Sequence, residues 1–259
     1  MNATIRPSGR KIVIIGATSA IAEQCARLWA AEAPAELVLV GRDESRLATI
    51  GDDLHVRAPA ARIRRLTVDF QDPAAIDALI HDIAAEGAID IALVAHGMLP
   101  DQHACQQDLA ANRQALLVNA VSPVLFAEAL ASVMLQRGHG TVAVIGSVAG
   151  DRGRKSNYVY GAAKGLVARY MQGLQHRLAL QKSPVRAVLI KPGPTDTPMT
   201  AHLKTGTGRA SMAAPEEVAR CIVRGIDRGR AVVYAPGKWA LIMLIVRCLP
   251  DFVFRRINL

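Results

Sequence analysis

Short apolar runs alternate along the chain with segments in which apolar residues recur at the spacing of a helix. The runs are rich in β-branched residues and are bounded by turns, as in 11–15, which Gly16 follows. This pattern predicts six strands, over 11–15, 36–40, 63–68, 89–94, 141–145 and 186–190. Helices are predicted between them, over 19–33, 44–53 and 73–85 and over a longer stretch after residue 94.

The predicted strands are apolar almost throughout rather than alternating between apolar and polar residues. Such strands are expected when helices cover both faces of a sheet. The order of the elements therefore predicts an α/β fold with a doubly wound parallel sheet of the Rossmann-like kind. No linker, low-complexity tract or internal repeat divides the sequence, so we expect a single domain over 1–259.

The end of the chain, 239–259, is an apolar and basic extension. Its apolar run, 239–246, is too short to span a bilayer. The extension could lie on a membrane or receive a lipid tail through its aromatic and arginine side chains, which are Trp239, Phe252, Phe254, Arg247, Arg255 and Arg256. It could instead pack on the core or on a second subunit.

Tyr160 and Lys164 stand four residues apart in a segment of helical pattern, which places both side chains on one helix face. A nearby ammonium favours phenolate, and a tyrosine with an ordinary pKa of about 10 needs such a correction to transfer protons near neutrality. Ser147 follows a predicted strand, where its hydroxyl can bond a substrate carbonyl. With Asn119 upstream, these residues indicate carbonyl reduction or alcohol oxidation, whereas an isolated Tyr–Lys pair would be an ordinary surface pair.

The turn after the first predicted strand consists of small residues. In an open α/β sheet, ligands bind at the carboxyl ends of the strands, and small side chains let backbone N–H groups approach a pyrophosphate. A simple tight turn is the alternative, because only one of the usual glycines is present. The residues of this turn assigned to a cofactor are Gly16, Thr18, Ser19, Ala20 and Ile21.

The second predicted strand leads into Gly41 and Arg42, where a site that prefers NAD commonly carries an acidic residue for the ribose. An arginine at this position better suits a 2′-phosphate, so NADP(H) is the favoured cofactor. Asp43 offsets part of that charge, and NAD(H) therefore stays open.

The 259 residues carry a formal net charge of +9, which implies attraction to anions such as a phosphorylated cofactor, a lipid phosphate or a membrane. Nucleic acid is excluded as a partner, because no nucleic-acid module is recognisable and only four Phe, four Tyr and two Trp are present. The four cysteines show no C-x-x-C spacing, which argues against disulfides and a metal site. With no secretory signal in 1–10, we expect a cytoplasmic location, with association to the inner membrane surface as a variant.

The combination of these motifs resembles the short-chain dehydrogenase/reductase family over about 11–199. The resemblance implies that Ser147 and Tyr160 hold the carbonyl, that Lys164 binds the nicotinamide ribose and lowers the tyrosine pKa, and that Asn119 positions a proton-relay water. Further cofactor contacts are implied for Asp69, Phe70, Ala95, Pro192, Gly193, Thr195 and Thr197. Two departures are visible, because Ala20 and Ala22 replace glycines and 94–97 lacks the usual asparagines; His96 there either fills space or approaches the cofactor.

A narrower resemblance, to the decaprenylphosphoryl-2-keto-ribose reductases, rests on 95–99, 149–161, 199–204, 232–236 and 249–256. It implies reduction of the 2-keto sugar of a polyprenyl-phosphate at the cytoplasmic face of the membrane, a step of cell wall biosynthesis. Basic residues between the catalytic serine and tyrosine are assigned to the phosphodiester, or else form a solvated loop: Arg152, Arg154 and Lys155.

Two other functions remain open at this point. The first is a short-chain reductase of a soluble ketone or an acyl-carrier substrate, which would share the catalytic residues. The second is a cofactor-binding regulator without turnover, against which the full Asn, Ser, Tyr and Lys set argues. We expect the protein to form a homo-oligomer.

Overall fold

The computed structural model describes residues 9–32, 34–205 and 212–257, and for 202–205 the backbone alone. The basic start of the chain, 1–8, lies outside the described residues, as do residue 33 of the expected helix 19–33 and the last two residues of the C-terminal extension.

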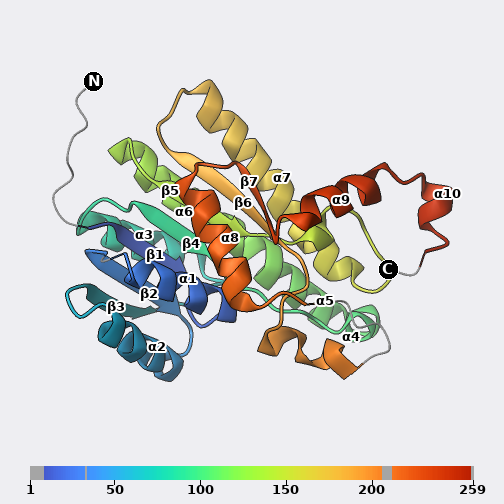
Figure 1. Cartoon of the computed structure of the whole chain (residues 1–259), viewed down its shortest axis with the longest axis horizontal. Coiled ribbons are helices and arrows are strands. Elements are labelled where there is room, and N and C mark those ends of the chain that lie inside the picture. The colour runs from blue at the N-terminus through green and yellow to red at the C-terminus, as the bar shows by residue number, and fades with distance from the viewer. Residues whose placement is uncertain (1–8, 33, 206–211, 258–259) are drawn as a thin grey trace.

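Seven parallel strands form one sheet in the order β3-β2-β1-β4-β5-β6-β7 (Figure 1). Their bounds are β1 Lys11–Ile15, β2 Glu36–Gly41, β3 Arg62–Thr67, β4 Ile91–Val94, β5 Thr141–Ile145, β6 Arg186–Pro192 and β7 Val232–Ala235. The predicted doubly wound α/β fold is confirmed. Six strands were expected, and the seventh, β7, is a four-residue edge strand.

The connecting segments are mostly helical. The helices before β5 are α1 Ala20–Ala30, α2 Glu44–Arg57, α3 Pro73–Ala85, α4 Gln102–Gln107, α5 Leu109–Leu116, η1 Leu117–Val121 and α6 Ser122–Arg137. Those after it are η2 Val148–Gly150, α7 Tyr158–Leu180, η3 Pro198–Thr205, α8 Pro215–Asp227, α9 Lys238–Cys248 and α10 Asp251–Phe254. Helix α1 ends at Ala30, earlier than expected, and α2 continues four residues past its expected end at residue 53, to Arg57.

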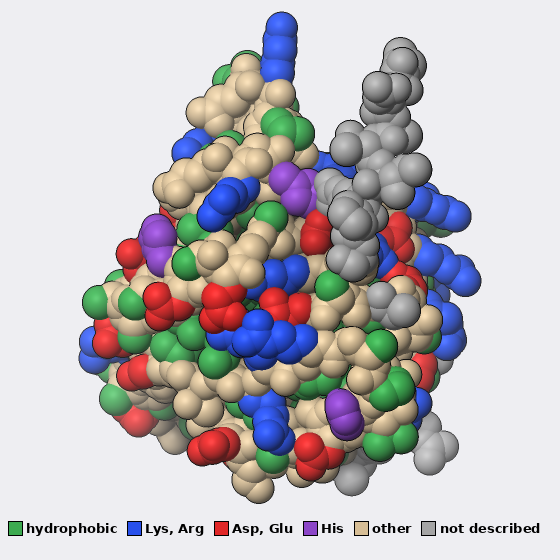
Figure 2. Space-filling view, turned by 90° about the vertical axis from the view of Figure 1, so that its left-hand side faces the viewer, with side chains coloured by type: hydrophobic (Ala, Val, Ile, Leu, Met, Phe, Trp, Pro, Cys, Tyr) green, Lys and Arg blue, Asp and Glu red, His purple; other side chains and the backbone are tan. Residues whose placement is uncertain are grey.

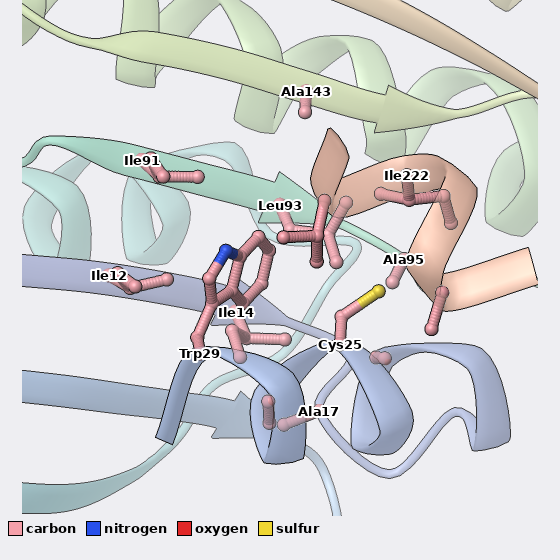
Figure 3. Packing of buried hydrophobic residues seen from close by; sticks show 14 of the residues in the cluster. Ile12, Ile14, Ala17, Cys25, Trp29, Ile91, Leu93, Ala95, Ala143 and Ile222 are labelled. Carbon is pink, nitrogen blue, oxygen red and sulfur yellow. The ribbon is translucent and has the colours of Figure 1, made fainter. Parts of the chain in front are cut away.

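Successive side chains of the strands point to opposite faces of the sheet, and each face has its own apolar layer. Ile12 and Ile14 pack under α1 and α8, where Trp29 and Cys25 fill the interior (Figure 3). Val13 belongs to the opposite layer, against α3, α6 and α7. Two covered faces explain why the strands are apolar throughout.

The continuous helical stretch Leu109–Arg137 is long and apolar enough to cross a membrane by length and composition alone. Half of its most apolar window is buried inside the fold, and α6 contributes Phe126 and Leu130 to the core. The stretch is therefore accounted for as a core helix of this fold.

Candidate active site

A cavity of about 650 Å³ opens at the carboxyl ends of the strands, where the turns after β1, β2, β4, β5 and β6 meet. It brings together nearly all residues that the sequence assigned to a cofactor or to chemistry. These are Gly16, Thr18, Ser19, Ala20, Ile21, Arg42, Phe70, Ala95, Asn119, Ser147, Tyr160, Lys164, Pro192, Gly193, Thr195 and Thr197, together with Arg154.

Three assigned residues do not line this cavity: Asp69, Arg152 and Lys155. The carboxylate of Asp69 turns back on its own loop and accepts a hydrogen bond of 2.9 Å from the backbone N–H of Gln71. Its neighbour Phe70 does line the cavity. Of these two expected cofactor contacts, only Phe70 is therefore in a position to reach a cofactor.

Close backbone packing fixes Ser147 beside Tyr160. Ser147 is the N-cap of η2, and its Oγ accepts a hydrogen bond of 3.1 Å from the N–H of Ala149. A Cβ on Gly150 would lie 2.7 Å from the Lys164 backbone carbonyl, and one on Gly161 would lie 2.9 Å from the Ala149 oxygen. These two glycines let α7 lie directly on the turn after β5, so that Tyr160 and Ser147 line the same cavity.

Burial dominates the protonation of both Tyr160 and Lys164. It raises the pKa of Tyr160, and the nearby side chain of Ser147 offsets only part of that rise. Burial also lowers the pKa of Lys164 to about 8. The pKa of Tyr160 is therefore raised overall, whereas the sequence led us to expect that Lys164 would lower it. The Nζ atom lies 5.8 Å from the tyrosine ring centre and donates to the backbone oxygen of Ile145 at 3.0 Å. Tyr160 is consequently protonated at neutral pH, as a proton donor must be.

Asn119 lies in η1, a π-helical turn between α5 and α6, and its side chain is fully buried. Its Nδ2 donates to the Ala115 oxygen and its Oδ1 accepts from the Met98 N–H, both at 2.9 Å. A Cβ on Gly97 would lie 2.9 Å from that Oδ1 and 3.6 Å from Lys164 Nζ. Asn119 thus ties the helix to the loop beside Lys164. Its role in holding a relay water stays a prediction.

The turn after β1 meets the physical requirements of a pyrophosphate site. Gly16 has φ +80, and a Cβ there would lie 2.6 Å from the backbone nitrogen of His96, so this position requires glycine. Ser19 caps α1 without a side-chain hydrogen bond, which leaves the N–H groups of the first helical turn available at the cavity. The methyl group of Ala22 is buried in the core and not in the turn.

Two arginines lie at the end of the cavity next to β2. Arg42 was expected from the sequence. Arg46, one turn into α2, also lines the cavity and donates to the Thr18 oxygen at 3.1 Å. Its spacing of four residues from Arg42 could have indicated this second arginine from the sequence. Asp43 caps α2 by accepting from the Arg46 N–H at 3.0 Å, so its carboxylate is engaged in a helix cap.

His96 fills space between aromatic rings. Its ring centre lies 4.6 Å from that of Phe70 and 5.6 Å from that of Phe126, and its Nε2 is 2.8 Å from Ser122 Oγ. Burial, followed by the charges of Lys164 and Arg42, lowers its pKa to about 3. His96 is therefore neutral and carries no charge toward the cavity.

The loop after η2 is anchored to distant parts of the chain. Asp151 forms a buried ion pair with Lys191 and accepts a hydrogen bond of 2.8 Å from the Tyr234 hydroxyl. Arg152 donates to the backbone oxygens of Val246 and Leu249, both at 2.6 Å. The assignment of Arg152 to a substrate phosphodiester is corrected here, because these carbonyls of the C-terminal extension engage its guanidinium.

The C-terminal extension also reaches the cavity. Trp239, from the first turn of α9, lines it, and a Cβ on Gly193 would lie 1.9 Å from the indole nitrogen. The indole therefore packs directly on the Pro192–Gly193 turn. The start of the C-terminal extension therefore lines the active site.

The chain is similar to known proteins along nearly its whole length. The sequence profile of the short chain dehydrogenases matches residues 10–208. An uncharacterised oxidoreductase of Mycobacterium tuberculosis is 35% identical over 248 residues, which are 95% of this chain and 96% of the relative. An uncharacterised oxidoreductase of Streptomyces coelicolor is 31% identical over 251 residues, 96% of each chain.

Among solved structures, a short-chain dehydrogenase from Sphingobium yanoikuyae in complex with NADPH superposes with a TM-score of 0.78 at 24% identity, covering 93% of this chain and 97% of that one. A short chain dehydrogenase from Burkholderia cenocepacia in complex with NADP gives 0.80 at 17% identity, covering 96% and 97%. At these identities the superpositions establish the shared fold.

Proposed function

This chain belongs to the short-chain dehydrogenase family, and from that premise we propose that it is an NADP(H)-dependent reductase of a keto group, with Tyr160 as the general acid. The observation that carries the proposal is that Tyr160 and Ser147 line one cavity, with Lys164 buried one helical turn away and burial raising the pKa of the tyrosine hydroxyl.

Each residue of the site has a separate role in the proposed reaction. A bound nicotinamide cofactor supplies the hydride, and the residues that would hold it are Gly16 with the first turn of α1, Lys164 and the Pro192–Gly193 turn. Tyr160 donates its proton to the oxygen of the reacting carbonyl as negative charge develops there. Ser147 donates a hydrogen bond to the same oxygen, and the Lys164 ammonium stabilises the resulting phenolate.

The proposed preference for NADP(H) rests on Arg42 and Arg46. Both guanidinium groups lie at the cavity edge, and a 2′-phosphate is a dianion that they can bind with paired hydrogen bonds. The NADPH and NADP complexes of structurally similar proteins support this preference. NAD(H) is the alternative, and titration of the protein with both cofactors decides between them.

For the substrate, we propose the 2-keto sugar of a polyprenyl-phosphate, reduced at the cytoplasmic face of the membrane. Arg154 supports a phosphorylated substrate because it lines the catalytic cavity. The outer face of α9 supports a lipid environment, since Leu241 is 64% exposed and Ile245 is 55% exposed. An amphipathic segment flanked by arginines can bind an anionic membrane surface.

The proposed reaction is tested by NADPH oxidation with a panel of ketones, including soluble sugars, acyl-carrier thioesters and a polyprenyl-phosphate keto sugar. Faster turnover of the lipid-linked substrate supports the proposal. Faster turnover of a soluble ketone supports the first alternative, and NADPH binding without turnover of any substrate supports the regulator.

Membrane contact is tested with vesicles that contain anionic phosphatidylglycerol. The variant Leu241→Gln/Leu244→Gln should bind them more weakly than the unaltered protein, and added salt should weaken binding of both. Val56→Gln/Leu180→Gln is the matched control, because these two side chains are also exposed but lie on α2 and α7. Equal binding by all three proteins would contradict the membrane proposal.

We also propose a homo-oligomer. Several large apolar side chains on α5, η1 and α7 are exposed in the single chain: Leu109, Leu116, Val121 and Leu166. Sedimentation of the purified protein tests this, and a monomer at micromolar concentration would contradict it.

A further inference from the structure

A second cavity, of about 640 Å³, lies between the loop after η2 and the C-terminal extension. Two segments about a hundred residues apart in the sequence form it. Five of the residues that line it are cations, and one is a carboxylate: Arg152, Arg154, Lys155, Arg255, Arg256 and Asp251. By contrast, basic and acidic side chains are interspersed on the face of the molecule in Figure 2.

Arg152 builds this cavity and does not supply a free cation to it. Besides its two bonds to backbone carbonyls of the extension, its guanidinium donates to Asp251 at 2.8 Å and lies 3.9 Å above the ring of Phe254. The carboxylate of Asp251 is therefore already paired. Arg152 thereby holds α10 against the loop, which keeps the two basic segments facing each other.

The other four cations have no hydrogen bond or ion pair from their side chains to any group in the part of the chain that the structure describes: Arg154, Lys155, Arg255 and Arg256. Like charges gathered in one concave site repel each other, and a bound anion removes that repulsion. Arg154 is also partly withdrawn from water, and this desolvation lowers its pKa.

Arg154 links this second cavity to the catalytic cavity. It lines both the second cavity and the catalytic cavity that contains Tyr160 and Ser147. An anionic group bound by Arg154, Lys155, Arg255 and Arg256 would therefore belong to a ligand whose other end can reach the catalytic tyrosine.

We propose that the second cavity is a phosphate subsite for the substrate, with Arg255 and Arg256 of the extension as ligands of the phosphate alongside Arg154 and Lys155. This inference rests on the proposed reduction and deepens it, because it makes the substrate a ketone that carries a phosphate group. Phosphate fits better than a carboxylate, since its oxygens can accept hydrogen bonds from several guanidinium forks at once. The subsite assigns the two arginines to the substrate and leaves membrane contact to the apolar face of α9.

The test is a calorimetric titration of the protein with inorganic phosphate. The protein is first saturated with NADPH, so that the cofactor occupies its own phosphate sites. The variant Arg255→Gln/Arg256→Gln should weaken phosphate binding at least about tenfold, because two charge-assisted contacts are lost. Arg228→Gln/Arg230→Gln is the matched control, since it removes the same charge from two exposed arginines after α8 and should leave phosphate binding unchanged.

Two results would overturn the subsite. One is equal phosphate binding by the protein and the Arg255→Gln/Arg256→Gln variant. The other is an equal loss in the Arg228→Gln/Arg230→Gln control, which would show that net charge alone attracts the anion. A second arm uses phosphatidylglycerol vesicles: if the double variant loses vesicle binding but keeps inorganic phosphate, the arginines bind lipid headgroups and the substrate subsite is wrong.

A kinetic arm measures discrimination between substrates. The ratio of kcat/KM for a phosphorylated ketone over its unphosphorylated analogue should fall at least about tenfold in Arg154→Gln, and an unchanged ratio contradicts the subsite. The calorimetric arm involves no turnover. A protein that binds phosphate through Arg255 and Arg256 but reduces no ketone would therefore refute the proposed reduction and leave the subsite intact.

Discussion

The buried ammonium of Lys164 should destabilise the folded protein at neutral pH, and removing it should stabilise the fold while ending catalysis. Lys164 is 3% exposed, and its Nζ donates to the backbone oxygen of Ile145 at 3.0 Å. Burial lowers its pKa from 10.5 to about 8. We therefore consider Lys164→Met, which keeps the length of the side chain and removes the charge.

The magnitude follows from the change in pKa. A lowering from 10.5 to about 8 corresponds to about 3 kcal/mol of unfavourable free energy in the folded state at neutral pH. The variant leaves the Ile145 oxygen without its donor, which costs about 1 kcal/mol. Lys164→Met should therefore raise the free energy of unfolding by about 2 kcal/mol at pH 7.

The sign of the pH dependence is fixed by the direction of the shift. Between pH 8 and pH 10.5 the unfolded chain holds the Lys164 proton and the folded protein does not. The stability of the unaltered protein therefore rises with pH relative to that of the variant throughout this window. Above this pH window Lys164→Met should no longer be the more stable protein. Its free energy of unfolding should be about 1 kcal/mol lower than that of the unaltered protein, because the Ile145 oxygen has lost its hydrogen-bond donor.

Urea unfolding at pH 7, 8.5 and 10 measures the difference in free energy of unfolding between the unaltered protein and Lys164→Met. The other titrating groups are the same in both proteins, so their contributions cancel in this difference. Lys238→Met, which alters an exposed lysine at the start of α9, is the control and should show no such dependence. The reasoning fails if Lys164→Met is less stable at pH 7, or if the difference between the two proteins is constant from pH 7 to pH 10.

Three further outcomes are expected. Tyr160→Phe should lower turnover by about 10³-fold with NADPH affinity retained in fluorescence titration, and retained activity would exclude it as the acid. Arg42→Ala and Arg46→Ala should each weaken NADPH binding by about tenfold and NADH binding much less, whereas equal losses would make them structural. Asp151→Asn should lower the free energy of unfolding by about 3 kcal/mol, because it leaves the buried ammonium of Lys191 without its counter-charge. This prediction is contradicted if the measured loss is smaller than the loss from breaking an ion pair on the surface.

Elements with a continuous apolar pattern were predicted well from the sequence. The bounds of β1, α3 and β5 agree with the predicted ranges, since these segments are long, periodic and flanked by clear turns. Strand β7 was missed because it has four residues at the edge of the sheet, and only Val233 and Ala235 are buried there. So short a strand is defined by its pairing with β6 and has no local signature.

The candidate site could be located from spacing alone, but its electrostatics could not. The four-residue spacing of Tyr160 and Lys164 correctly placed both at one cavity. The direction of the tyrosine pKa was wrong, because burial depends on what packs around the ring. The partners of Arg152 and Asp151 were also missed, since they lie 40 to 99 residues away in the sequence. Contacts of this separation leave no periodicity to detect.

The C-terminal extension combines the two alternatives that its sequence left open. On one side of α9, Met243 is buried and Trp239 packs on the Gly193 turn, as a core helix would. On the other side, Leu241, Leu244 and Ile245 are exposed, which a helix in water rarely shows over three apolar residues. A deletion of 239–259 would remove both sides at once, so it cannot separate a role in the site from a role at a membrane. Substitutions on the exposed side can, because they leave Trp239 and the Arg152 contacts in place.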